Sequence, residues 1–257
     1  MLRFPAITDA AGVAQTKWLE SLESTVSMLN LPKKIACMIA GAGCVMLVSG
    51  GIAVADDTEI CLNVEGQIEA LDRIGACSRA IEGGLSGDQR IKAHSLRGMG
   101  YGQIGQMDNA IADFSVVLEA DKTNVPLWIA RARAYFHKQQ HDLAMLDLAE
   151  AIKLDPDNAT VQNLMGKNHF MLGNYELAIK FFDRAIDLNA NFYNAFVNRA
   201  TTYYRDNQLQ KAMKDVNAAY LMLPPNDSRG RGLLQLRVAI EQAYASQQRA
   251  NTNQQTN

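Results

Sequence analysis

Alanine-rich amphipathic stretches dominate the centre of the chain, and their small and bulky apolar positions recur every 34 residues. Two columns of this pattern hold only small residues, and a third holds only bulky apolar ones. The small columns are Gly98, Ala132, Gly166, Ala200 and Ala110, Ala144, Ala178, Ala212; the bulky column is Phe114, Leu148, Phe182, Val216. Small residues let two helices approach closely, and a bulky residue nearby fills the space beside them. The pattern therefore predicts helix-turn-helix units stacked on copies of one another.

These columns resemble the tetratricopeptide repeat family. Numbered from the start of each repeat, the family pattern has a small residue at position 8, an aromatic residue at positions 11 and 24, alanine at positions 20 and 27, and proline at position 32. The pattern appears in repeats at 91–124, 125–158, 159–192 and 193–226. Val117 departs from the usual alanine, and Lys122 and Ala190 replace the proline that Pro156 and Pro224 keep. The resemblance implies an all-α fold, an α-solenoid of stacked helix-turn-helix repeats in a right-handed superhelix. It also implies an adaptor that binds another protein.

Other segments flank the repeats, and each carries its own pattern. Residues 56–89 are expected to form an N-terminal half-repeat, in which Cys77 takes the bulky position 24. Residues 227–248 are expected to form a capping helix, because stacked repeats otherwise expose an apolar end. Its helical spacing is carried by Leu233, Leu236, Ile240 and Tyr244. The polar tail at 249–257 is expected to be disordered.

A targeting signal is predicted at 28–55. Lys33 and Lys34 precede an apolar run at 35–54, which ends in Ala53-Val54-Ala55 before acidic residues. Positive charge, an apolar centre and a small-residue end are the marks of a secretory signal peptide. An apolar run of about twenty residues can also span a bilayer, so a retained membrane anchor is the alternative. Residues 1–27 precede this signal and are expected to be a non-native or dispensable extension, with Met28 as the true start. The alternative is that the extension is a genuine and harmless part of the protein.

The cysteines fit an exported protein. Cys37 and Cys44 lie in the apolar run, so a cleaved chain keeps only Cys61 and Cys77. The region around Cys77 resembles the opening segment of exported bacterial tetratricopeptide repeat proteins. A disulfide between Cys61 and Cys77 would close a loop of about 17 residues; two reduced, buried cysteines are the alternative. We expect a periplasmic or secreted bacterial protein, or an inner-membrane scaffold or assembly factor if the signal is uncleaved.

Arginine and aspartate occur together at positions 7 and 23 of three repeats and are lost together in the other. The pairs are Arg97 with Asp113, Arg131 with Asp147, and Arg199 with Asp215; the third repeat has Met165 and Phe181. An unpaired buried charge is costly, whereas replacing both partners by apolar residues can be nearly neutral. The joint loss predicts that these are structural ion pairs rather than ligand-binding arginines.

The resemblance also predicts a binding groove. In the family, positions 2, 5, 9, 12 and 13 of each first helix line the concave face. The groove residues predicted on or beside these positions are Arg133, Lys167, Asn163, Asn198, Phe136, Phe170 and Tyr204. Cations beside aromatic side chains favour an extended peptide that carries a carboxylate and an apolar side chain. The alternative is that the aromatic residues belong to the core and the cations to a solvated face.

Composition and motifs give no sign of catalysis. A net charge of −2 gives no general attraction to nucleic acid. Gly100, Gly102 and Gly105 spell a dinucleotide-binding motif, but they fall within a predicted helix rather than after a strand. His137 and His141 have helical spacing without a further converging ligand. We expect no enzyme activity, no cofactor and no metal. The expected partner is a protein or an extended peptide, with membrane contact only through an uncleaved signal.

Overall fold

The computed structural model describes residues 45–48, 51–54, 56–63 and 68–255 of the chain. The chain divides into two compact units, Met1–Ile60 and Cys61–Asn257. In the first unit, strands β1 (Val45–Val48) and β2 (Gly51–Val54) pair antiparallel, with Val45 opposite Val54. The extension at 1–27 and most of the predicted signal at 28–55 lie outside the described residues. Within the described residues, no helix has the length and apolar character needed to cross a membrane.

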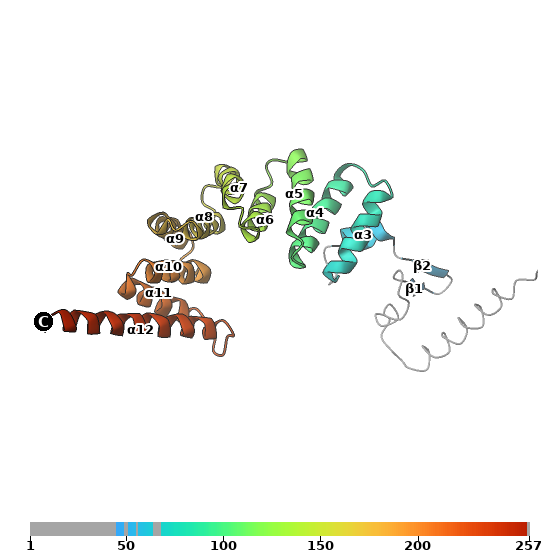
Figure 1. Ribbon diagram of the computed structural model, residues 1–257. Helices are drawn as coiled ribbons and strands as arrows, with labels where there is room; N and C mark the ends of the chain where they lie inside the picture. Colours follow the sequence, from blue (N-terminus) through green and yellow to red (C-terminus); the bar gives the residue numbers. More distant parts are fainter. Residues whose placement is uncertain (1–44, 49–50, 55, 64–67, 256–257) are drawn as a thin grey trace, which may run out of the picture. The chain divides into compact units, whose positions relative to one another are not determined.

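The second unit is an all-α solenoid of stacked helix pairs (Figure 1). A short helix α2 (Asp57–Leu62), which begins before the unit boundary, and α3 (Ala70–Glu82) precede the repeats. The four pairs are α4 (Gly87–Gln103) with α5 (Met107–Ala120), α6 (Val125–His137) with α7 (His141–Leu154), α8 (Ala159–Met171) with α9 (Tyr175–Leu188), and α10 (Tyr193–Arg205) with α11 (Leu209–Leu221). The last helix is α12 (Gly230–Gln255).

The turn inside each pair depends on one residue with a left-handed backbone. That residue is Gly105, Gln139, Gly173 or Asn207, each at position 15 of its repeat, with φ between 59° and 79°. Glycine adopts this conformation without a steric cost, and asparagine tolerates it better than most residues. Between pairs, the side chains of Asn124 and Asn158 accept hydrogen bonds from backbone N–H groups and cap α6 and α8. The left-handed residue at position 15 and the capping asparagines therefore help to fix where the helices of each repeat end and begin.

Successive first helices lie closer to one another than successive second helices. Contacts join α4 to α6, α6 to α8 and α8 to α10, while second helices lack comparable contacts with each other. The stack is therefore curved, and Figure 1 shows α6 and α8 on its inner side with α7 and α9 outside. The boundary between α7 and α8 is packed less extensively than the boundaries between α5 and α6 or between α9 and α10.

The core of each pair is a contact between position 8 of the first helix and position 24 of the second. A Cβ atom on Gly166 would lie 2.6 Å from the Phe182 ring, and one on Gly98 would lie 2.8 Å from the Phe114 ring. The other two pairs have alanine at position 8 and a smaller residue opposite, Leu148 or Val216. The size of one residue is therefore matched to the size of the other, as close packing requires.

This match predicts opposite effects for two glycine substitutions. Gly166→Ala should lower the free energy of unfolding by about 1 to 2 kcal/mol, because overpacking outweighs the better helix propensity of alanine. Gly102→Ala is the matched control, since a Cβ there has nothing within 4 Å. The control should raise the stability by about 0.5 to 1 kcal/mol. Urea denaturation measures both, and adding Phe182→Leu should rescue Gly166→Ala. Equal effects of the two alanines would contradict this account.

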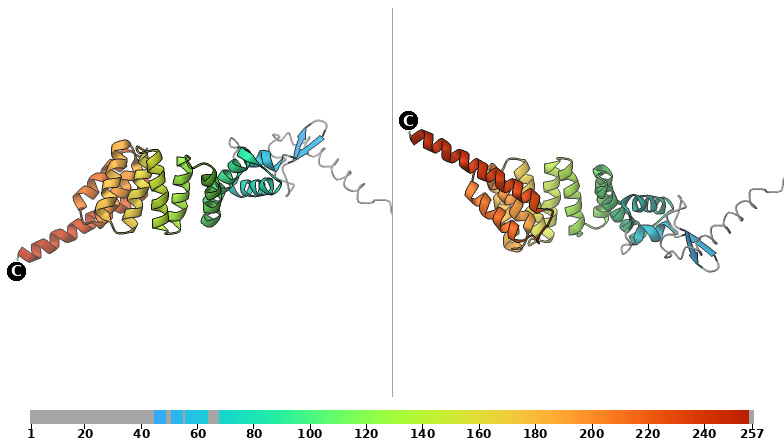
Figure 2. Two further views of the ribbon diagram at one scale, coloured as in Figure 1. Left: turned by 90° about the horizontal axis from the view of Figure 1, so that it is seen from above. Right: turned by 90° about the horizontal axis from the view of Figure 1, so that it is seen from below.

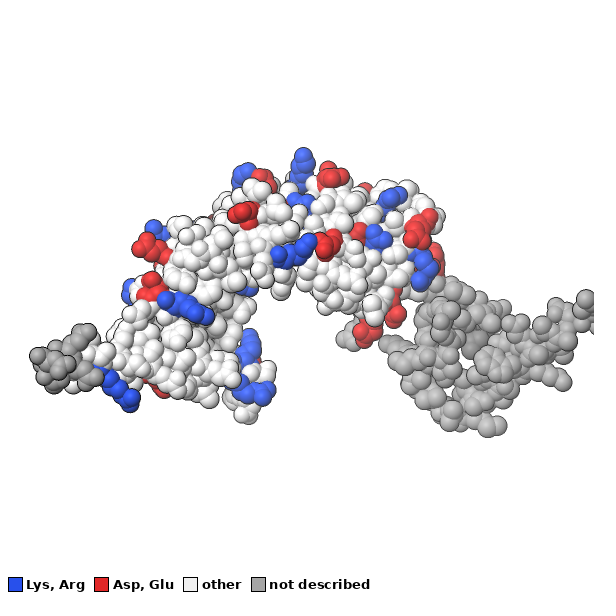
Figure 3. Space-filling model, viewed as in Figure 1, with Lys and Arg blue, Asp and Glu red and all other residues white. Residues whose placement is uncertain are grey.

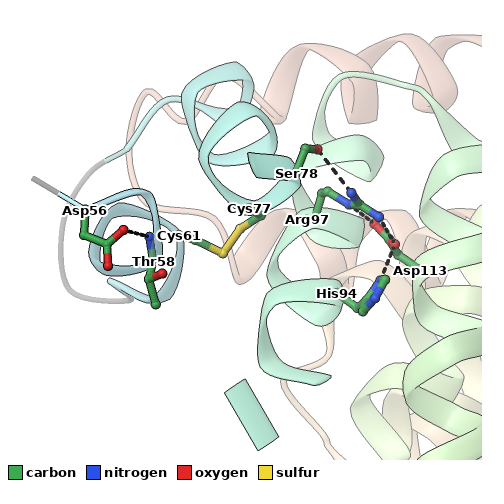
Figure 4. The surroundings of a disulfide bond; sticks show 8 residues. All are labelled: Asp56, Thr58, Cys61, Cys77, Ser78, His94, Arg97 and Asp113. Atoms are coloured by element: carbon green, nitrogen blue, oxygen red, sulfur yellow. Dashed lines mark hydrogen bonds and ion pairs between the residues drawn. A yellow bond between two sulfur atoms is a disulfide. The ribbon is translucent and has the colours of Figure 1, made fainter. Parts of the chain in front are cut away.

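A disulfide joins the two helices at the N-terminal end of the solenoid. Cys61 of α2 and Cys77 of α3 form a disulfide, and both residues are fully buried (Figure 4). The separation of 16 residues equals the spacing from Gly98 to Phe114, so the disulfide occupies the place of the position 8 to position 24 contact. The predicted half-repeat therefore includes a short first helix, and a covalent bond replaces its side-chain packing.

The C-terminal end is covered by α12, which continues beyond the ends of the neighbouring helices (Figure 2). Leu233 and Ile240 are buried against the α10–α11 pair, in the segment predicted as a capping helix. The prediction of a disordered tail at 249–257 is wrong as far as Gln255, which ends the helix. Glutamine, alanine and arginine are good helix formers, and no proline or glycine interrupts the segment after Gly232.

Candidate functional site

The arginines at position 7 are held by carboxylates inside the solenoid. Arg131 donates from Nε and Nη2 to the two oxygens of Asp147, at 2.9 and 2.8 Å. Its Nη1 donates to the Ser115 hydroxyl of the preceding repeat at 2.9 Å. The side chains of Arg131 and Asp147 are 16% and 6% exposed, and their hydrogen bond raises the pKa of the arginine. Each such arginine therefore joins two second helices and is not open to a ligand.

The same geometry recurs in the first and fourth repeats. Arg199 donates to both oxygens of Asp215 and to Asp183 of the preceding repeat. Arg97 donates to Asp113 and to Ser78, as Figure 4 shows. Nδ1 of His94 also lies 2.8 Å from Asp113. The three predicted pairs thus meet across the first and second helices of their own repeats.

The third repeat replaces the ion pair by apolar and aromatic contacts. Met165 packs against the core cluster of the preceding pair. The Phe181 ring stacks on His169, with the ring centroids 5.2 Å apart and the planes 7° apart. Burial lowers the pKa of His169, which favours the neutral ring. A neutral imidazole suits this stack, since no carboxylate is present at position 23.

Two cations of the predicted groove lie together at the boundary of the second and third repeats. The Lys167 ammonium lies 4.6 Å from the centre of the Phe136 ring. Burial lowers the pKa of Lys167, and the positive charge of Arg133 lowers it further. Within the described residues, neither cation forms an ion pair with a carboxylate, whereas the position 7 arginines do. Their positive charges are therefore not neutralised by an ion pair within that part of the chain.

The two asparagines of the predicted groove are also in contact with each other. Asn198 of α10 donates from Nδ2 to Oδ1 of Asn163 of α8 at 2.9 Å. Both helices lie on the inner side of the stack, where successive first helices contact one another. The NH₂ group of Asn163 and the side-chain carbonyl of Asn198 take no part in this bond. An amide pair of this kind can donate to and accept from a peptide backbone.

The structure does not join the aromatic residues into a continuous stripe. Phe170 contacts Tyr175 of α9, with centroids 5.7 Å apart. Tyr204 packs against the core cluster near α12, and Phe136 packs against the core of the second pair. All three are half-buried, so each contributes to the core while exposing part of its surface. Only Phe136 is in contact with a groove cation among the described residues.

Sequence reasoning missed one polar contact beside the groove. Asn168 is 1% exposed, and its side chain lies 3.1 Å from Nδ1 of His141 in the preceding repeat. His141 also contacts the Phe136 ring edge-on, with centroids 5.3 Å apart. His141 therefore supports the aromatic platform under Lys167. The sequence does contain a sign of this contact. Position 10 of the repeat holds asparagine here, where the other repeats hold glycine, alanine or threonine.

Charged side chains of both signs are mixed on the face of the solenoid seen in Figure 3. Figure 3 shows lysine and arginine side chains interspersed with aspartate and glutamate over the described part of the solenoid. Interspersed charges of both signs produce little net field at a distance. In the described part of the chain, that face therefore carries no large patch of a single sign of charge.

Comparison with known proteins identifies the repeats of this chain. Models of the TPR repeat and the tetratricopeptide repeat match residues 132–173 and 159–192, and solved tetratricopeptide repeat proteins share the fold. The chain belongs to the tetratricopeptide repeat family. It is 30% identical over 152 residues to the mitochondrial import receptor subunit TOM70 of Homo sapiens, covering 55% of this chain and 25% of the receptor subunit. It is 23% identical over 185 residues to a DnaJ homolog subfamily C member 7 homolog of Schizosaccharomyces pombe, covering 66% and 38%. The chain thus spans less than half the length of these curated relatives.

Solved tetratricopeptide repeat structures share the architecture. A tetratricopeptide repeat protein from Parabacteroides merdae has a TM-score of 0.60 at 15% identity, covering 71% of this chain and 70% of that one. A thermophilic protein of the family from Thermus thermophilus has a TM-score of 0.53 at 16% identity, covering 68% and 91%. YrrB, described as having an unusual peptide-binding site, has a TM-score of 0.53 at 18% identity, covering 68% and 84%.

Proposed function

We propose that this tetratricopeptide repeat protein is an adaptor that binds an extended, acidic peptide segment of another protein in its groove, without catalysis. The observation that carries the proposal is the pair of Arg133 and Lys167, which face no carboxylate within the described residues. The three position 7 arginines each have an aspartate partner, whereas Arg133 and Lys167 have no ion-pair partner within the described residues. A carboxylate from a partner would supply the missing countercharge.

The neighbouring groups favour a peptide over a small anion. The half-buried Phe136 ring beneath Lys167 offers apolar contact, and the Asn163–Asn198 pair offers amide donors and acceptors one turn away. These groups come from α6, α8 and α10, so a ligand that uses all of them must extend across three repeats. The peptide-binding site of YrrB, a protein of the same fold, is consistent with this type of ligand.

Charge reversal tests the groove. The double variant Arg133→Glu/Lys167→Glu should lose binding to acidic peptides on a peptide array, while helicity and melting temperature stay near those of the wild type. The matched control is Lys180→Glu/Lys214→Glu, which changes the net charge equally at exposed positions on second helices. Binding should also weaken with salt, since partly exposed ion pairs are screened. Retained binding in the groove variant, or equal loss in the control, would refute the proposal.

We further propose that the chain is exported. Lys33, Lys34 and the small-residue end of the apolar run support a cleaved signal, and the Cys61–Cys77 disulfide fits an oxidising compartment. The mass of the chain recovered from the periplasm of its bacterial host should correspond to a start at Asp56. Recovery only from the membrane fraction with Lys33 retained would favour the anchored alternative, and cytoplasmic recovery would contradict export.

A further inference from the structure

The terminal helix α12 packs in the manner of a first helix. In α6, Leu127 and Ala134 are buried seven residues apart, and Leu233 and Ile240 of α12 have the same spacing and burial. In this alignment, position 8 of a first helix lies five residues after the first of these two buried residues, Leu127 in α6 and Leu233 in α12. In α6 that position is Ala132, which is 1% exposed beneath the second helix of the pair. In α12 it is Val238, which is 42% exposed.

The side of α12 that would face a second helix is therefore open. Arg231, Leu234, Val238, Glu241 and Ala245 follow one another at spacings of three and four residues and are all exposed. Leu234 is 56% exposed. Among helices of residues 61–255, α12 packs on α11 and α10, and Figures 1 and 2 show its outer side uncovered in that part of the chain. Leu234 and Val238 thus form an exposed apolar strip flanked by Arg231 and Glu241, and such a strip is typical of a surface that pairs with another helix.

A regular second helix from a partner does not fit this surface. Position 8 is glycine or alanine in every complete repeat, because the bulky residue at position 24 must approach it closely. Val238 fills that space. The open face is instead suited to a helix pair at an ordinary separation, in which Leu234 and Val238 meet side chains of similar size.

The open face is complementary to itself in the antiparallel direction. Leu234 and Val238 lie two residues either side of Leu236, and Arg231 and Glu241 lie five residues either side of it. Two copies of α12 that cross antiparallel at the level of Leu236 would therefore place each Leu234 opposite a Val238. They would also place each Arg231 opposite a Glu241. The intrahelical bond from Arg237 to Glu241 at 2.9 Å helps to orient that carboxylate.

We propose that a second copy of this chain covers the open face, giving a two-fold symmetric dimer through antiparallel α12 helices. A closed two-fold pair uses the same surface on both copies, as this self-complementary face requires. The interface is a short helix pair, at the small end of specific interfaces, so the dimer is concentration-dependent rather than obligate. It leaves the groove cations on α6 and α8 outside the interface.

Sedimentation velocity on the full chain over a concentration series tests the dimer. The wild type should shift from monomer to dimer, and Leu234→Glu/Val238→Glu should remain monomeric with unchanged helicity. The matched control is Leu146→Glu, at an apolar residue of α7 that is 64% exposed, and it should dimerise like the wild type. A wild type that stays monomeric at the highest attainable concentration would overturn the proposal, as would a dimer that survives the α12 double variant.

Charge reversal tests the antiparallel register without removing apolar groups. Arg231→Glu and Glu241→Arg should each weaken the dimer several-fold, because each places like charges opposite one another twice. The combined variant Arg231→Glu/Glu241→Arg should restore much of the loss. Single variants without effect, or a combined variant no better than either single one, would overturn the proposed register.

Discussion

Asp147→Ala is expected to lower the free energy of unfolding by about 3 to 5 kcal/mol, because it leaves the guanidinium of Arg131 without its carboxylate inside the solenoid. Arg131 makes two hydrogen bonds to Asp147 and one to Ser115, so its remaining side-chain hydrogen bond is to an uncharged group. Urea denaturation followed by circular dichroism measures the change. The matched control is Asp187→Ala, at an exposed aspartate of α9, with an expected effect within about 0.5 kcal/mol.

The third repeat shows how the loss can be relieved. Arg131→Met/Asp147→Phe copies its apolar pair into the second repeat, and we expect this double variant to be more stable than Asp147→Phe alone. Ser115 stays satisfied in the double variant, because its hydroxyl also donates to the Ile111 carbonyl. Additive effects of the two substitutions would show that the arginine and the aspartate are not coupled.

Cys61→Ser is expected to lower the melting temperature by several degrees, corresponding to about 3 kcal/mol of lost stability. The disulfide joins residues 16 apart in the sequence and holds α2, a helix of 6 residues that is too short to be stable alone. Without the bond, the buried face of α3 around Cys77 would lose its cover. Thermal unfolding with and without reductant measures the effect.

The second cysteine supplies the control for this prediction. Cys77→Ser should be as destabilising as Cys61→Ser, and the double variant should be little worse than either single one, because only one bond is lost. Reductant should affect the wild type alone. Two titratable thiols in the native protein would contradict the premise of this prediction, which is the disulfide itself.

The fold can be predicted from the repeated positions because positions 8 and 24 of each repeat are in contact with each other. Gly166 and Phe182, or Ala132 and Leu148, are matched in size, and the match can be read directly from residues 16 apart in the sequence. The phase of the helices is equally accessible, since α6, α8 and α10 begin at the repeat starts Val125, Ala159 and Tyr193. Short-range packing rules suffice for such a stack.

The contacts among the predicted groove residues are harder to derive from the sequence, because they join different repeats through side-chain conformations. Column positions place Phe136 and Lys167 on the inner helices, but they do not place the ammonium over the ring. The amide contact between Asn163 and Asn198 likewise depends on how α8 and α10 are offset. The length of α12 is not predicted by composition, because a polar segment can still be helical when it contains helix formers and no breaker.

The lightly packed boundary between α7 and α8 has a consequence for cooperativity. In a stacked array each unit is ordered by its nearest neighbours, so the weakest boundary divides the array into two folding segments. The third repeat has Met165 where its neighbours have a bridging arginine, which removes one polar link across the same boundary. Arg133 belongs to one segment and Lys167 to the other. A ligand held by both would therefore couple the two segments, and its binding would be thermodynamically linked to cooperative unfolding.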